Sequence, residues 1–227
     1  MGPPGGKEVR EALFSQNIDS VAGLDGFTNK FFMFNLEIVH DEVINAVREF
    51  FLNSFMTYGA NSNFIDLIIK KDNVVDIKDF RPISIDNTIP KIINKIIAIR
   101  LGNVVKGIIT PNQFGFVSGR NIQTYIFTAS ECINVMIRKV KQGNFVVKVD
   151  ISKAFDTMKW IFLLSILRMH GFSTRFINLV HAILKSVRLS ILVNGSPRGF
   201  FQCSMGVRQG DPLSGILFSL GLFKSIP

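Results

Sequence analysis

Apolar residues recur at helical spacing through the first part of the chain. The longest run lies between Asp41 and Phe55, and shorter runs cover residues 9–14 and 29–34. Asp41 suits an N-cap, because an aspartate oxygen can accept a hydrogen bond from a free backbone N–H in the first turn. We therefore predict that residues 1–66 form a helical region that precedes the rest of the fold.

Three later segments have the composition of β-strands. Residues 64–71 and 145–149 are short apolar runs, and the second run ends at Asp150. Residues 187–202 hold two apolar runs around Asn194-Gly195. Asn-Gly between such runs is the strongest short signal for a β-hairpin, and its type I′ turn requires positive φ at both residues.

The remaining periodic segments predict further helices, and the mixture gives an α+β fold. Pro90 lies near the start of one of them, where proline is tolerated. Gly171 follows another and suits its C-cap. The expected helices cover residues 87–102, the stretch from the turn at 113–119 to Arg138, and residues 160–170 and 175–186.

Composition narrows the class of protein. The chain has 227 residues, 47% of them hydrophobic, and a mean hydropathy of +0.30, so it can bury a core over one or two domains. No run of 18 apolar residues appears, and the start lacks the apolar core of a signal peptide, so we expect no membrane segment. Two cysteines without metal-ligand spacing favour a reducing, intracellular setting, nuclear or cytoplasmic.

Charge is distributed unevenly around a net value of +9. Residues 1–66 hold four basic residues against nine acidic ones, a net charge of −5. Residues 67–227 hold 22 basic residues against eight acidic ones, a net charge of +14. A basic block of this size suits a polyanionic partner, although charge that serves only solubility gives the same pattern.

Asp150 is the first candidate for chemistry. A buried strand with a carboxylate at its tip presents a metal ligand to solvent. An N-cap or a solvated loop carboxylate is the alternative for Asp150. Phe155 and Asp156 follow closely, and by themselves they suit a core position and a helix cap.

Two arginines suit phosphate contacts. Pro82 keeps Arg81 out of the helical region, so the guanidinium extends from a strand-like segment, and arginine can bind phosphate through two hydrogen bonds. Arg120 follows Gly119 and precedes an apolar helix, so it either caps that helix or contacts a backbone phosphate. A plain surface cation remains the alternative for Arg81.

The block Gly206-Val207-Arg208-Gln209-Gly210-Asp211-Pro212-Leu213-Ser214 forms a turn that opens a helix. A Gly- and Gln-bearing turn of this kind suits contact with phosphate, sugar or base. Gly206 and Gly210 can also serve the turn alone, and Asp211-Pro212 is an ordinary helix opening. Turn geometry alone does not require a glutamine at position 209, so Gln209 is the residue of this block that most favours a functional role.

Four ordered blocks together resemble the reverse transcriptase domain of LINE-type (non-LTR) retrotransposons, in the style common in plants. The blocks are 79–84, 113–122, 148–160 and 193–220, and the segment 25–27 with Phe31-Phe32 resembles the leader of that family. The resemblance runs from about residue 20 to 220. It implies right-hand polymerase fingers and a partial palm over residues 67–227.

The resemblance also implies roles for individual residues. Asp150 matches the first catalytic carboxylate, which binds two Mg²⁺ ions with a later Asp-Asp pair, and the Ile151 carbonyl joins that metal shell. Phe155 matches the bulky residue that screens the sugar 2′ position. The remaining implied contacts are Arg81, Ala154, Gln209 and Gly210 with the nucleotide, and Lys70, Arg120 and Arg208 with nucleic acid.

The sequence also departs from the family. Leu24, Ile69, Pro90 and Gly215 stand where the family usually has other residues, as a decaying copy would show. No Asp-Asp pair follows Leu213 before the sequence ends at Pro227. We therefore expect a fragment of an RNA-directed DNA polymerase that is inactive alone, because one carboxylate cannot hold two Mg²⁺ ions. The intact parent would use an RNA template, a DNA primer and a deoxynucleotide. The alternatives are a non-catalytic nucleic-acid-binding remnant and a pseudogene product, and the oligomeric state is left open.

Overall fold

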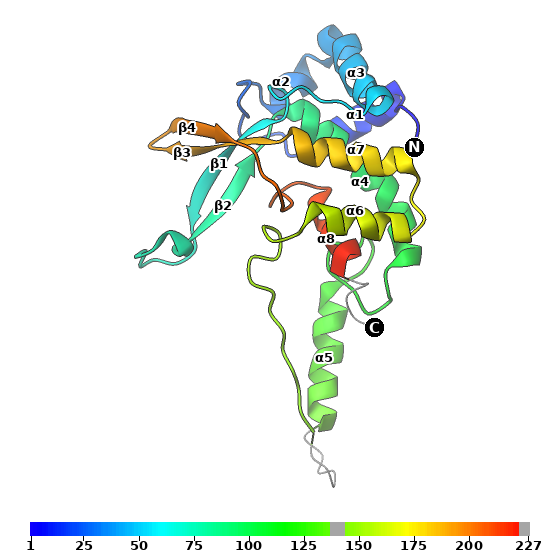
Figure 1. Ribbon diagram of the computed structural model, residues 1–227, viewed down its shortest axis with the longest axis vertical. Coiled ribbons are helices and arrows are strands. Elements are labelled where there is room, and N and C mark those ends of the chain that lie inside the picture. Colours follow the sequence, from blue (N-terminus) through cyan, green and yellow to red (C-terminus); the bar gives the residue numbers. More distant parts are fainter. Residues whose placement is uncertain (137–143, 223–227) are drawn as a thin grey trace.

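The computed structural model describes residues 1–136 and 144–222. Helices and strands are mixed along the described chain, as the sequence predicts (Figure 1). The helices are α1 (Gly6–Phe14), α2 (Asn29–Phe34), α3 (Leu36–Asn53), α4 (Thr88–Ile108), α5 (Ile122–Met136), α6 (Trp160–Met169), α7 (Thr174–Ser186) and α8 (Ser214–Leu222). The strands are β1 (Ser62–Ile69), β2 (Phe80–Ile85), β3 (Arg188–Val193) and β4 (Ser196–Phe201), and a 3₁₀ turn, η1 (Ile77–Asp79), precedes β2.

The strands form one sheet in the order β2-β1-β3-β4. β1 pairs antiparallel with β2 and parallel with β3, and β3 pairs antiparallel with β4. The predicted hairpin is confirmed: Asn194 and Gly195 connect β3 to β4 with φ of 51° and 74°. The β1–β2 and β3–β4 hairpins therefore extend from one side of the helices (Figure 1).

One hydrophobic core connects the helices other than α5, which has no buried residue among those described. α4 lies at its centre, because α1, α3 and α8 all pack against it. The largest fully buried side chains of α4 are Ile92, Ile93, Ile96, Ile97 and Leu101. Residues from α1 and α3 belong to the same core as residues from α6, α7 and α8. The predicted boundary after residue 66 falls inside β1, so both segments share this core and the sheet.

The two largest differences between predicted and observed helix boundaries lie in α3 and α4. α3 begins at Leu36, so Asp41 lies inside the helix and Asn35 takes the N-cap position. α4 continues past Gly102 to Ile108, because Val105 extends the buried stripe by another turn. The predicted end of the helix at Arg138 lies outside the described residues.

The strand predicted at 145–149 is wrong. Residues 144–150 have no regular structure and are exposed; the side chains of Phe145 and Val149 are 84% and 79% exposed. Among the described residues no strand lies beside this segment. A strand without a neighbour leaves its backbone groups to water, so its apolar sequence alone cannot hold it in a sheet.

No helix in the described part of the chain is long and apolar enough to cross a membrane.

Candidate nucleotide and nucleic-acid site

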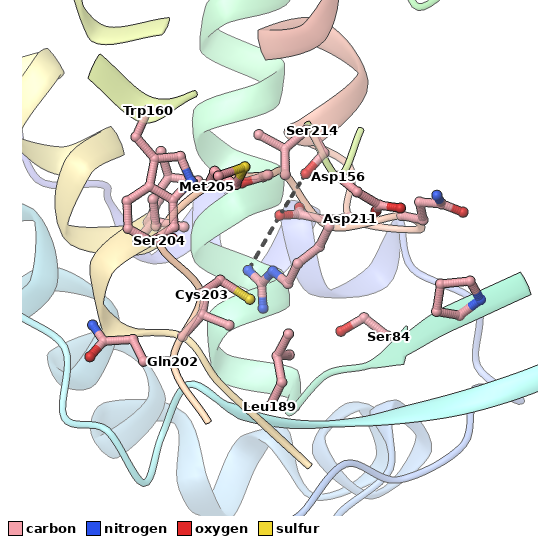
Figure 2. A pocket seen from close by; sticks show the side chains of 18 of the residues that line it. Ser84, Asp156, Trp160, Leu189, Gln202, Cys203, Ser204, Met205, Asp211 and Ser214 are labelled. Carbon is pink, nitrogen blue, oxygen red and sulfur yellow. Dashed lines mark hydrogen bonds and ion pairs between the residues drawn. The ribbon is translucent and has the colours of Figure 1, made fainter. Parts of the chain in front are cut away.

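A cavity of about 450 Å³ lies between the sheet, α7 and the segment that connects β4 to α8 (Figure 2). Ile65, Pro82 and Ser84 line it from β1 and β2, since alternate residues of a strand share one face. Trp160 closes another side at the start of α6. The connecting segment 201–209 forms much of the remaining wall and brings Gln209 to the cavity.

A buried ionic cluster holds that connecting segment against the sheet. One guanidinium nitrogen of Arg208, Nη1, lies 3.2 Å from an Asp86 carboxylate oxygen, and the other, Nη2, lies 3.3 Å from an Asp211 carboxylate oxygen. The three side chains are 9%, 6% and 4% exposed, respectively. Asp86 follows β2, and Asp211 precedes α8. The cluster therefore connects the base of the β1–β2 hairpin to the turn that carries Gln209.

Neutral side chains complete the cluster. Asn61 accepts a hydrogen bond from Arg208 at 3.1 Å, and Asn94 of α4 donates one to Asp211 at 3.0 Å. Ser84 donates to Asp86 at 2.5 Å. Buried charges are tolerated when they are paired and hydrogen-bonded in this way.

Burial shifts the pKa values of Asp211 and Arg208 in the cluster and of Lys91 near Asp86. Burial raises the pKa of the Asp211 carboxyl, and the positive charge of Arg208 counteracts the shift. Burial acts to lower the pKa of Arg208, but Asp86 and Asp211 outweigh it and the net shift is upward. Burial also lowers the pKa of Lys91, which Asp86 and Asp25 oppose. Arg208 therefore stays charged between two carboxylates.

A second set of contacts attaches the segment after Asp150 to the same turn. The backbone N–H of Gly206 donates to the Met158 carbonyl at 2.7 Å, and that of Val207 donates to the Phe155 carbonyl at 2.8 Å. The Trp160 indole N–H donates to the Gly206 carbonyl at 2.7 Å. Gly206 has φ of 90°, and a Cβ there would lie 3.0 Å from the Asp156 carbonyl oxygen. Only glycine fits at this close approach.

Phe155 belongs to an aromatic cluster. Its ring stacks on that of Phe218 from α8, with centroids 4.8 Å apart, and meets the edge of Phe116 at 5.9 Å. Phe155 is half-buried and packs against the core, so the structure gives it the packing role that its sequence context also allowed. Ala154 beside it is half-buried as well.

The structure brings some of the predicted site residues together and separates others. Gln209 lines the cavity, and Gly210 follows it with φ of 97°, so the turn has the conformation that its glycines suggest. Arg81 is exposed on β2, on the face opposite to Pro82 and Ser84, which line the cavity. Arg81 and Gln209 are therefore not on the same side of the sheet.

The other predicted basic contacts already have protein partners. Arg120 donates to the carbonyls of Thr110 and Gln113 at 2.6 and 2.5 Å, so it binds the chain after α4. Lys70 donates to the Lys78 carbonyl at 2.8 Å at the exposed tip of the β1–β2 hairpin. The guanidinium of Arg208 is buried between Asp86 and Asp211. In this arrangement it does not face solvent, where a phosphate would bind.

Asp150 and Ile151 lie on the exposed segment before α6 and are not among the residues that line the cavity. No group of three His, Cys, Asp or Glu side chains in the described part of the chain is placed to hold a metal ion. Two Mg²⁺ ions need several carboxylate oxygens to offset their mutual repulsion. One exposed carboxylate and a backbone carbonyl supply too few, so the donors described here do not fit a two-metal centre.

The sequence did not identify the Asp86–Arg208–Asp211 cluster. Asp86 follows the segment 80–85 with no motif that indicates a role, and Asp211 with Pro212 has the sequence of an ordinary helix opening. The resemblance implies that Arg208 contacts nucleic acid, whereas the structure pairs it with Asp86 and Asp211. The signal in the sequence is a pair of acidic residues at the ends of elements, Asp86 and Asp211, with Arg208 three residues before the second.

The fold and the residue blocks define the class: this is part of a right-hand polymerase, with fingers and a portion of the palm. Residues 68–225 match the family model described as "Reverse transcriptase (RNA-dependent DNA polymerase)". The chain belongs to this family.

Several relatives come from transposable elements. The chain is 29% identical to the "Transposon TX1 uncharacterized 149 kDa protein" of Xenopus laevis, over 95% of this chain and 16% of that protein. It is 30% identical to the "Retrovirus-related Pol polyprotein from type-2 retrotransposable element R2DM" of Drosophila melanogaster, over 66% of this chain and 14% of that protein. A Nasonia vitripennis Pol polyprotein from a type-1 element R2 is 25% identical, over 88% of this chain and 19% of that protein.

These relatives confirm the resemblance to non-LTR retrotransposon reverse transcriptases, whereas the plant-like style stays a prediction. The chain spans about a sixth of the length of the curated relatives it matches.

Proposed function

We propose that this chain supplies the fingers and part of the palm of an RNA-directed DNA polymerase, whose reaction is templated nucleotidyl transfer. The observation that supports this most is the Gln209 turn. The Arg208 cluster holds it at the base of the β1–β2 hairpin, beside a cavity of about 450 Å³. A preformed cavity with a few polar groups on apolar walls is typical of a small-ligand site.

In this proposal the residues of this chain bind and orient the nucleotide and the nucleic acid, and they do not carry out the chemical step by themselves. Gln209 offers hydrogen bonds to a nucleotide in the cavity, and the Ser84 hydroxyl, which donates its proton to Asp86, can accept one. Arg81 is exposed on the opposite face of the β1–β2 hairpin, so it offers a cation to a nucleic-acid phosphate on that face and not to the nucleotide in the cavity. An RNA template and a DNA primer are the partners we propose, because 22 basic residues against eight acidic ones in residues 67–227 attract polyanions. Mg²⁺, which reverse transcriptases generally use, would need ligands in addition to Asp150.

We expect no primer extension by the 227-residue chain alone, because the described donors do not fit a two-metal centre. The test uses an RNA template, a DNA primer, Mg²⁺ and deoxynucleotides. A second arm uses the chain fused to a downstream segment of a related intact element, one that carries an Asp-Asp strand and thumb. Extension by the fusion, abolished by Asp150→Asn, is the expected result.

Two outcomes would change the proposal. Robust extension by the unfused chain, lost on Asp150→Asn, would show that the donor argument is wrong. A folded fusion without extension would favour the second candidate, a non-catalytic nucleic-acid-binding remnant. The observation behind that candidate is the basic block in a chain whose described residues group no metal-binding side chains.

A further inference from the structure

A separate groove of about 380 Å³ lies on the other face of α7 from the cavity. Ile183 and Leu184 face the cavity, whereas Asn178, His181 and Lys185 line the groove. The opposite wall is the loop between α3 and β1, which contributes Phe55 and Tyr58. None of the predicted site residues lines this groove.

Two aromatic rings are exposed at the groove. Phe55 is 66% exposed and Tyr58 is 51% exposed, although large apolar rings normally gain from burial. The guanidinium carbon of Arg188 lies 4.4 Å from the centroid of the Tyr58 ring, a cation–π contact that fixes its position. The Tyr58 ring is therefore held in place, and both rings offer solvent-facing surfaces for stacking.

The charges around the groove have one sign. Lys185 supplies a positive charge on α7, and His181, one turn before it, supplies ring nitrogens that can hydrogen-bond to a phosphate; both side chains are exposed. No acidic residue lines the groove. Residues 157–210 contain seven lysines and arginines and no aspartate or glutamate, and residues 50–65 contain no charged residue. The local potential therefore attracts anions, unlike a surface of interspersed charges.

The walls are preformed. Arg175, at the start of α7, donates to the Phe51 carbonyl at the end of α3 at 3.1 Å. Gln202 after β4 donates to the Lys185 carbonyl at 2.7 Å. These contacts attach α7 to the elements on either side, so binding in the groove would order little that is not already ordered.

We propose that this groove binds a single-stranded segment of nucleic acid, with a base stacked on Tyr58 and Phe55 and a backbone phosphate at His181 and Lys185. Exposed rings beside cations are the combination that single-strand binders use, because every base has a face for stacking and every linkage a charge. The inference takes its ligand class from the proposed function but concerns a different surface. Phe55 and Tyr58 lie outside the residues that match the family model.

The test measures binding of the 227-residue chain to fluorescein-labelled single strands of about 12 nucleotides, a length within the usual site size. Fluorescence anisotropy is recorded in separate arms with RNA and with DNA of the same sequence, over a series of salt concentrations. The groove variants are Tyr58→Ala, Tyr58→Phe and Lys185→Gln. The matched controls are Phe34→Ala and Lys30→Gln, because Lys30 lies over the exposed ring of Phe34 on α2 in a similar pair, 6.0 Å from its centroid.

We expect Tyr58→Ala to weaken binding about five- to hundredfold, the loss of one stacked base, and Tyr58→Phe to bind like the wild type. Lys185→Gln should lower the slope of log affinity against log salt by about 0.7, the value for one phosphate contact on a single strand. The two control variants should leave affinity and slope unchanged. Comparison of the RNA and DNA arms identifies which strand the groove prefers.

Circular dichroism establishes that each variant is folded. If the wild type binds and the folded Tyr58→Ala and Lys185→Gln variants bind with the same affinity, the groove is not the binding site. The proposed function would then be unaffected. Wild-type chain that binds no nucleic acid even at low salt would overturn both. If Tyr58→Ala does not fold, ultraviolet crosslinking of 4-thiouridine RNA to wild-type chain decides, since the crosslinked peptide must then include the loop at 54–58.

Discussion

Arg208 is the residue that joins the parts of the candidate site. It pairs with Asp86 after β2 and with Asp211 before α8, and all three side chains are nearly inaccessible to solvent. The sequence could place Arg208 in a functional block, but it could not show that Asp86 would lie beside it. That contact depends on how β1, β2 and α4 pack, which no local pattern encodes.

We expect Arg208→Met to lower the free energy of unfolding by about 3–5 kcal/mol, because it leaves two buried carboxylates without their cation. Arg198→Met on exposed β4 is the matched control and should change it by less than about 0.5 kcal/mol. Urea denaturation followed by circular dichroism measures both values. Adding Asp86→Asn to Arg208→Met should restore part of the lost free energy of unfolding. If Arg208→Met and Arg198→Met lowered the free energy of unfolding equally, the argument would be contradicted.

For Asp150, the sequence predicts a chemical role but not the position of the residue in the structure. The resemblance could assign its chemistry by position, yet the structure leaves it exposed and away from the cavity. A resemblance can suggest the role of a residue. The position of its side chain depends on the elements that pack beside it, and no strand among the described residues lies beside Asp150.

Among the elements, those with strong local signals were predicted well. α2 and the β3–β4 hairpin formed as expected, because a helical period and an Asn-Gly turn act within a few residues. Residues 145–149 have equally good strand composition but remain irregular. A strand depends on a partner, so composition alone cannot predict whether it joins a sheet.

The tip of the β1–β2 hairpin should open in acid. The side chain of Lys71 lowers the pKa of Asp79, as do the backbone N–H groups of Val75 and Asp76 that donate to it. Because the folded pKa lies below the ordinary aspartate value, this stabilisation is full above that value and disappears as the pH falls through the folded pKa. The amide signals of Val75 and Asp76 in an NMR titration should shift together in that acidic window. Asp79→Asn should remove the transition, and its persistence would assign it to another group.

At the scale of the whole molecule, the hydrophobic core includes residues from both ends of the chain, whereas the positive charge does not extend over its first part. One core extends from α1 to α8, whereas positive charge concentrates in residues 67–227. The composition predicted the core, whereas it left the basic block open between a polyanionic partner and a contribution to solubility. Composition could not predict that apolar side chains of α5 and the segment before α6 would remain exposed. Ile126, Phe127 and Val147 are among them.

This exposed apolar surface should make the chain self-associate. Exposed apolar segments with unpaired backbone groups act as templates for intermolecular strand pairing. Replacing Phe145 and Val147, which are 84% and 69% exposed, with lysine should lower the association measured by light scattering several-fold, because charge opposes such pairing. Val75→Lys at the hairpin tip is the control, since Val75 is 90% exposed but lies outside that segment. If Val75→Lys reduced association as much as the double variant, net charge rather than the 145–149 segment would be the cause.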